Sequence, residues 1–218
     1  MPECATPLPA LPRPPHPSEV PMPSVRTLTL ADVALPRASV LRDVVFIVGA
    51  SILTALAARI AVPVPWSPVP LTGQTFAVLL TGAALGTRRA LLAQALYLVE
   101  GAAGLPVFAG GIAGPLVFAG PTAGYLIAFP LAAAVTGALA ERGWDRRFGT
   151  MLAAMLLGDA VILVSGLAAL SALVPEPRLL AAGLLPFVPG DIVKAVAAAI
   201  VLPTAWRFVG GRRGGSGA

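Results

Sequence analysis

The stretch FVPGDIVKAVAAAIVLPTAWRFV, residues 187–209, is apolar and long enough to cross a membrane, yet its first turns contain two charged side chains. About 20 predominantly apolar residues are needed to span a hydrocarbon core. Asp191 and Lys194, the only lysine of the chain, stand three residues apart and would share one face of a helix. Because charged groups inside a bilayer usually mark a functional site, this segment predicts both a membrane fold and a polar clamp for a ligand. A salt bridge at a helix end is the alternative.

The composition of the whole chain is typical of a polytopic membrane protein. Of its 218 residues, 57% are hydrophobic and only 11% are charged, whereas soluble domains carry about 25% charged residues. The net charge of +5 is not arranged as a basic stripe with interleaved aromatic residues, so we expect no nucleic-acid partner. Cys4 is the only cysteine, and no cluster of histidine or cysteine lies in the apolar segments. We therefore expect neither a disulfide framework nor a metal site.

Six transmembrane helices of an all-α membrane protein are predicted, at residues 42–62, 71–87, 89–105, 121–140, 149–173 and 187–209. Between the third and fourth lies PVFAGGIAGPLVFAGP, which repeats VFAG at 107–110 and 117–120 and is too short and too glycine-rich to be a further span. Irregular backbone at membrane depth is tolerated only where protein or a cavity covers it. We expect a folded-in loop that walls a pocket.

The remaining parts of the chain indicate its domain organisation and orientation. Residues 1–36 are rich in proline and are predicted to be a disordered tail, residues 37–209 form the membrane domain, and residues 210–218 form a flexible C-terminal tail. If the N-terminus is cytoplasmic, ten arginines between residues 37 and 213 fall on the cytoplasmic side, and only Arg59, Arg178 and Lys194 fall toward the opposite side. Cytoplasmic loops are enriched in such residues, so both termini are predicted to be cytoplasmic.

This orientation places several polar and aromatic residues together in the outer half of the protein. Candidate pocket residues are Thr72, Gln74, Tyr97, Glu100, Tyr125, Asp191 and Lys194. For Thr72 a helix cap is the alternative, and for the two tyrosines it is an interfacial belt. Asp159 stands in the middle of the fifth span without an obvious basic partner. It could pair with Arg59, carry a proton or belong to the site, and we leave it outside the predicted binding set.

Four motifs carry a family resemblance. They are PVPLTGQT (68–75), ALYLVEGAAGLPVFAGG (95–111), GPTAGYLIAF (120–129) and PFVPGDIVKA (186–195). In this order the chain resembles the BioY family, the biotin-binding S components of energy-coupling-factor (ECF) vitamin transporters. The resemblance covers residues 40–209. One departure is Gly73, where relatives more often carry a larger apolar residue.

The resemblance implies a six-helix subunit of the bacterial plasma membrane that captures biotin from outside and is not an enzyme. For biotin, Asp191 would accept from the ureido N–H groups, and Lys194 would donate to the carbonyl or hold Asp191 in place. The resemblance also implies two kinds of partner, a transmembrane coupling subunit and paired ATPase subunits. Independently, the sequence contains no GxxxxGK[ST] phosphate-binding loop, and no cofactor is expected.

The first span offers a stripe of small residues, Ala50, Thr54 and Ala58, that could dock against the coupling subunit, since small residues allow close approach of helices in lipid. Ala57 and Ala61 offer a second register for the same contact. Packing inside the bundle is the alternative. Two other functions stay open. One is an S component for another vitamin. The other is an intramembrane hydrolase with Ser165 as nucleophile, which is disfavoured because the only histidine, His16, lies in the N-terminal tail.

Overall fold

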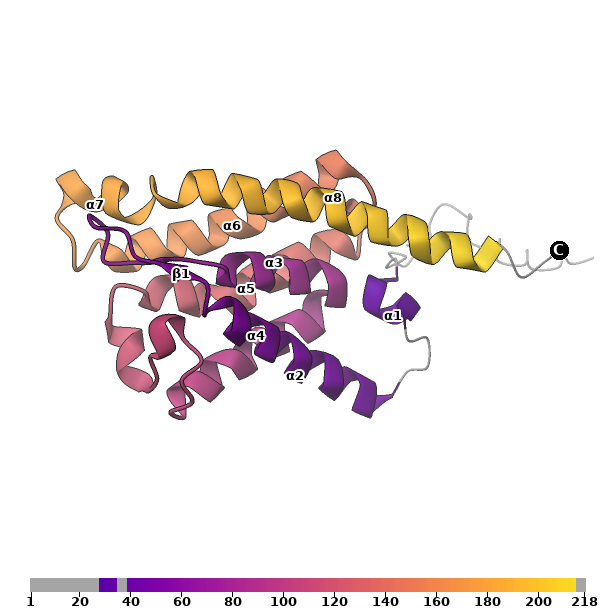
Figure 1. Ribbon diagram of the computed structural model, residues 1–218, viewed down its shortest axis with the longest axis horizontal. Helices are drawn as coiled ribbons and strands as arrows, with labels where there is room; N and C mark the ends of the chain where they lie inside the picture. Colours follow the sequence, from indigo (N-terminus) through magenta and orange to yellow (C-terminus); the bar gives the residue numbers. More distant parts are fainter. Residues whose placement is uncertain (1–27, 35–38, 215–218) are drawn as a thin grey trace, which may run out of the picture.

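The computed structural model describes residues 28–34 and 39–214, which form a bundle of helices (Figure 1). The elements are α1 (Leu30–Ala34), α2 (Val40–Ala57), β1 (Ala61–Val62), β2 (Leu71–Thr72), α3 (Gln74–Leu85), α4 (Thr87–Ala102), α5 (Ala123–Ala140), α6 (Phe148–Leu170), α7 (Glu176–Gly183) and α8 (Phe187–Gly214). Short 3₁₀ turns η2 (Ala109–Gly111), η3 (Pro115–Ala119) and η4 (Trp144–Arg146) are the other helical elements of the described part. The fold is mainly helical, as predicted.

Within residues 28–34 and 39–214, four stretches are long and apolar enough to cross a membrane: α2, α5, α6 and the run Glu176–Phe208, which contains α7 and most of α8. The other two predicted spans form shorter helices. Helix α3 is apolar but has only 12 residues. Helix α4 has 16 residues, which include Arg88, Arg89, Gln94 and Glu100.

The ends of the predicted spans need correction. Residues 61–62 and 71–72 were assigned to the first and second spans, but they form the antiparallel ribbon β1–β2, with Ala61 opposite Thr72 and Val62 opposite Leu71. The first span therefore ends with α2 at Ala57 and the second begins at Gln74. Helix α7 was not predicted, and α8 continues to Gly214, so the predicted C-terminal tail begins inside a helix.

Helix α5 is the centre of the bundle and packs against α3, α4 and α6. Glycines make these contacts close. A Cβ atom at Gly137 of α5 would lie 2.6 Å from the backbone nitrogen of Thr87, and one at Gly82 of α3 would lie 2.6 Å from the carbonyl oxygen of Ala133. Such small residues let helix backbones approach closely in lipid.

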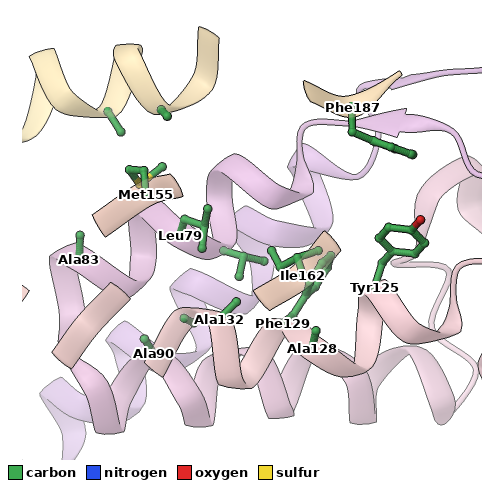
Figure 2. Close-up of a cluster of buried hydrophobic side chains, with 14 of the residues drawn as sticks. Leu79, Ala83, Ala90, Tyr125, Ala128, Phe129, Ala132, Met155, Ile162 and Phe187 are labelled. Carbon is green, nitrogen blue, oxygen red and sulfur yellow. The ribbon is translucent and has the colours of Figure 1, made fainter. Parts of the chain in front are cut away.

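The core between these helices is a continuous layer of apolar side chains (Figure 2). Leu79, Met155 and Ile162 fill its middle, and Phe129, Tyr125 and Phe187 continue it toward one end of the bundle.

Helix α1 and the C-terminal end of α8 lie at one end of the bundle, opposite β1 and α7 (Figure 1). Arg89 of α4 holds α1 there, because its guanidinium lies 2.7 Å from Asp32 and 3.0 Å from Asp43. Partial burial raises the pKa of Asp32, but hydrogen bonds from Arg89 and Thr29 outweigh this effect and hold the pKa below its usual value. The segment predicted as a tail, residues 1–36, thus contains a helix tied to the bundle, and its residues 1–27 lie outside the described part.

Candidate binding site

A cavity of about 520 Å³ lies at the end of the bundle where α3, α5 and α8 begin. Its walls come from these helices, from α6, from the loop before β2 and from the loop between α4 and α5. The polar lining residues are Thr72, Gln74, Thr75, Thr122, Tyr125, Asp191 and Lys194, and the rest of the lining is apolar. An apolar cleft with a few converging polar groups is the usual form of a small-molecule site.

Asp191 and Lys194 form the charged corner of this cavity. They lie one turn apart on α8, and the Lys194 ammonium is 2.9 Å from Oδ1 of Asp191. The same ammonium donates to the carbonyl oxygen of Thr72 at 2.9 Å and to the hydroxyl of Thr75 at 2.8 Å. Asp191 is only 5% exposed. Both groups line the cavity, so the salt bridge and a ligand-binding role are compatible.

Gln74 is held in the cavity wall by a residue behind it. The amide nitrogen of Gln74 donates to the Tyr97 hydroxyl at 2.5 Å, and that hydroxyl donates to the carbonyl oxygen of Val107 at 3.1 Å. Tyr97 is fully buried and does not line the cavity. Its ring packs edge-on against Phe108 and stacks on Phe129, both of which do line the cavity. Tyr97 therefore supports the wall from behind.

Glu100 lies outside the cavity, one turn beyond Tyr97 on α4. Its carboxylate accepts a hydrogen bond from the Ser51 hydroxyl of α2. Farther along the same helix pair, Gln94 donates to the hydroxyls of Thr54 at 3.1 Å and Thr81 at 3.2 Å. The contact of Glu100 joins α4 to α2, and the contacts of Gln94 join α4 to both α2 and α3.

The small-residue stripe of α2 faces the inside of the bundle. Ala50, Thr54 and Ala58 are at most 5% exposed, whereas the opposite face of α2 carries exposed Val45, Ile52 and Leu56. The expectation that the stripe docks on a partner is therefore corrected. Its small side chains serve the close packing of α2 on α4, the alternative that the sequence left open.

The glycine-rich loop between α4 and α5 forms one wall of the cavity through Phe108, Ile112, Leu116 and Val117, among others. It turns back on itself with positive φ angles at Gly104, Gly110, Gly111 and Gly114. L-amino acids with side chains rarely adopt these angles. The glycines therefore allow the loop to reverse direction tightly enough to present its apolar side chains to the cavity.

Three hydrogen bonds to backbone carbonyls connect the segments around the cavity. Arg59 donates to the carbonyl oxygen of Pro106 at 2.6 Å, and no ion pair between Arg59 and Asp159 occurs among the described residues. Ser67, in the loop between the strands, donates to the carbonyl oxygen of Ala182 in α7 at 2.6 Å. The Tyr125 hydroxyl donates to the carbonyl oxygen of Gly183 at 2.7 Å, and its ring packs at 5.7 Å from that of Phe187.

Several lining residues were not predicted. Thr75 follows Gln74 directly in the motif PVPLTGQT and touches both members of the charged pair, Lys194 at 2.8 Å and Asp191 at 3.4 Å. Its position in the first turn of a helix that begins at the pocket could have pointed to it. The apolar lining, which includes Phe129 and Ile162, carries no signal that separates it from the rest of a hydrophobic chain.

Comparison with known proteins places the chain in a family. The model of the BioY family matches residues 26–211. A probable biotin transporter BioY of Pyrococcus horikoshii is 40% identical over 68% of this chain and 86% of its own length. The biotin transporter BioY of Thermotoga maritima is 40% identical over 71% of this chain and 92% of its own length.

A solved structure supports the same fold. The crystal structure of the S-component for biotin from an ECF-type ABC transporter superposes with a TM-score of 0.67, at 23% sequence identity, over 77% of this chain and 92% of that chain. The four motifs, the helical bundle with its cavity and the family match over nearly the whole length agree, and the chain belongs to the BioY family.

Proposed function

We propose that this chain is the biotin-binding S component of an ECF-type uptake transporter, and that biotin occupies the 520 Å³ cavity. The observation that carries the proposal is the pairing of Asp191 and Lys194 at one corner of an otherwise apolar cavity. Membership of a transporter family makes the chain a binding subunit rather than an enzyme.

The chemistry of biotin matches this division of the cavity. Its ureido ring has two N–H donors and one carbonyl acceptor, while its thiophane ring and valeryl chain are apolar. Asp191 can accept from a ureido N–H. The three N–H donors of Lys194 already bond to Asp191, Thr72 and Thr75, so Lys194 can donate to the ureido carbonyl by exchanging one of these bonds. Gln74, Thr72 and Tyr125 offer further polar atoms in the wall. The aromatic and aliphatic lining then covers the rest of the ligand, which favours binding by removing apolar surface from water.

The competing hydrolase function has no support in the geometry. The hydroxyl of Ser165, the candidate nucleophile, donates to the carbonyl oxygen of Gly124 at 2.9 Å and so joins α6 to α5. Nucleophilic catalysis requires a base within hydrogen-bonding reach of the hydroxyl. His16 lies outside the described residues.

An equilibrium-binding panel tests the proposed function. The purified full-length chain should bind biotin much more tightly than thiamine or riboflavin, because of the three only biotin presents a ureido carbonyl flanked by two N–H donors to Asp191 and Lys194. Each ligand is titrated into the protein in detergent, and binding is measured by calorimetry. If thiamine or riboflavin binds more tightly than biotin, that vitamin is the ligand. If none of the three binds, the proposed function is wrong.

We further propose that α2, α3, α4, α5, α6 and α8 all lie within the plasma membrane, with both termini in the cytoplasm. The short helices α3 and α4 lie against α5, so neighbouring helices cover much of their surface. In this arrangement the cavity and α7 face the outside, and α1 with Arg89 faces the cytoplasm. The distribution of arginine residues along the sequence supports this orientation.

Cysteine labelling tests the orientation. Arg178→Cys in α7 should react with an impermeant thiol reagent added to intact cells, and Arg147→Cys should react only after the membrane is opened. Both residues are exposed, whereas neighbouring Asp145 is buried and would be a poor reporter. Cys4 is first replaced by serine so that it does not react. Labelling of position 147 but not 178 in intact cells would reverse the orientation.

The proposed partners are a transmembrane coupling subunit and paired ATPase subunits, and the exposed apolar face of α2 is the surface that we assign to the coupling subunit. This face contains Val45, Ile52 and Leu56. Gly49 lies among them, and a Cβ atom there would meet nothing within 4 Å. A glycine on an open apolar face lets a second helix approach closely in lipid.

Gly49→Trp tests this docking face. The bulky side chain should prevent close approach of the coupling subunit, so co-purification with that subunit and ATP-driven uptake should fall at least about tenfold. Biotin affinity should stay unchanged, because a side chain at Gly49 points away from the rest of the bundle into open space. Ile200→Trp, on the exposed face of α8, is the matched control and should assemble normally. If the Gly49 variant assembles normally, this face of α2 is not the docking surface for the coupling subunit.

A further inference from the structure

Asp159 is a buried carboxyl group in the middle of α6 that the proposed binding set does not include. It is 6% exposed. The charged groups that face it are Asp191 and Lys194 of α8, which line one small cavity together with it. Helices α3 and α5, which also pack against α6, contribute no charged side chain. Elements η4 and α7 adjoin the two ends of α6, away from its middle. Among the described residues the Lys194 ammonium forms its ion pair with Asp191, at 2.9 Å, so Asp159 is a second buried carboxyl group without an ion pair of its own.

The space between these groups is too small for bulk water. Asp159, Asp191 and Lys194 line a second cavity, of about 10 Å³. The remaining lining residues are Thr75, Phe76, Leu79, Met155 and Ala195. A cavity of this size holds at most a single water molecule. A second negative charge here could not be hydrated, and burying an unpaired charge is strongly unfavourable.

The hydrogen bonds of Asp191 leave one of its oxygens unpaired. Oδ1 accepts from Lys194 at 2.9 Å and from Thr75 at 3.4 Å. Oδ2 is buried and has no hydrogen-bond partner among the described residues. A buried acceptor without a donor is costly. One proton on the Asp159 carboxyl group would neutralise the surplus negative charge and would also supply the donor that Oδ2 lacks.

We propose that Asp159 is a positioning residue of the binding site, which holds a proton and donates it in a hydrogen bond to Oδ2 of Asp191. The hydrogen bond from Asp159 to Oδ2 fixes the orientation of the Asp191 carboxylate. Oδ1 and the Lys194 ammonium then face the larger cavity in one geometry. This inference rests on the proposed binding of biotin by the pair and adds the group that orients it.

Two variants of Asp159 test whether this residue acts through a bound proton or through a negative charge. Asp159→Asn keeps a hydrogen-bond donor, the side-chain amide, without any charge, so its biotin affinity should stay within about twofold of the original protein. Asp159→Leu has a similar shape but no donor, so Oδ2 stays unpaired and biotin affinity should fall about tenfold or more. Met155→Leu, which alters the same small cavity without touching a charge, is the matched control and should bind normally.

Two further measurements detect the proton itself and do not depend on whether the Asp159→Leu protein folds. The infrared spectrum of the original protein should contain the carbonyl stretch of a protonated carboxylic acid, and Asp159→Asn should lack that band. The original protein should also lose biotin affinity as the buffer becomes alkaline and Asp159 loses its proton. Asp159→Asn should not show this loss, since its amide always donates.

The possible outcomes are distinct. If the original protein binds no biotin, the proposed function fails. If it binds biotin but a folded Asp159→Leu protein binds equally well, the positioning role fails. Equal losses in Asp159→Asn and Asp159→Leu would show that the ionised carboxylate is required, and absence of the infrared band would exclude the bound proton. Either result overturns the inference while the biotin site stands.

Discussion

Lys194→Met should weaken biotin binding by about ten- to a hundred-fold. The ammonium of Lys194 holds Asp191, Thr72 and Thr75 in one arrangement, and methionine keeps most of the stem but removes the charge. Hydrogen bonds that involve charged groups contribute about 1.5–3 kcal/mol, which corresponds to this change in affinity. Titration calorimetry with the purified proteins measures it.

Asp191→Asn should cause a loss of the same size, because it keeps the shape but removes the charged acceptor. If the two residues act as a unit, the double variant should bind little worse than the weaker single variant, as expected for residues in one network. Val193→Met, on the exposed face of the same turn, is the control. If folded variants of both residues bind biotin with the original affinity, the pair is a structural salt bridge and does not contact the ligand.

Gly137→Leu should destabilise the fold more than any other single change considered above. A Cβ atom at this position would lie 2.6 Å from both the carbonyl carbon of Gly86 and the nitrogen of Thr87. These are backbone atoms at the junction of α3 and α4, so they cannot move aside as a flexible side chain can. Overpacking costs typically 1–3 kcal/mol, and we expect about 3 kcal/mol here.

The measurement is thermal unfolding in detergent, with Gly49→Leu as the matched control. Both positions are helical glycines that become leucine, but a Cβ atom at Gly49 meets nothing within 4 Å. The midpoint of unfolding should therefore fall sharply for Gly137→Leu and stay near the original value for Gly49→Leu. Equal midpoints would show that α5 can move away from the α3–α4 junction at little cost.

Sequence patterns predicted the long helices because lipid imposes a simple requirement of length and apolar composition on each one. The same reasoning failed at the strands β1 and β2, since two paired residues in each leave no periodic signal. Helix α7 was missed for a related reason, because its eight residues are too few to distinguish from a loop. The lengths of α3 and α4 depend on their neighbours, which the sequence of each segment does not reveal.

The polar residues that line the candidate site could be predicted better than the residues that hold its walls in place. Asp191, Lys194 and Gln74 stand out because polar groups are rare and costly in apolar segments. Tyr97 and Glu100 carry the same signal, yet they fasten the wall and the neighbouring helix from outside the cavity. Which side of a helix faces a cavity and which faces another helix is decided by tertiary packing. The burial of Ala50 and Ala58 is a further example.

The short length of α3 leaves room for the cavity. Its 12 residues extend about 18 Å at 1.5 Å per residue, whereas the hydrocarbon core is about 30 Å thick. A helix that began two turns earlier would fill the region above Gln74 with its own side chains. Residues 61–73 instead form a ribbon and a loop before α3, and Pro68, Val69, Pro70 and Thr72 of this segment line the cavity. A bound biotin would fill this space with its own apolar atoms, as core side chains do elsewhere in the bundle. Ligand binding would therefore also complete the packing of the bundle.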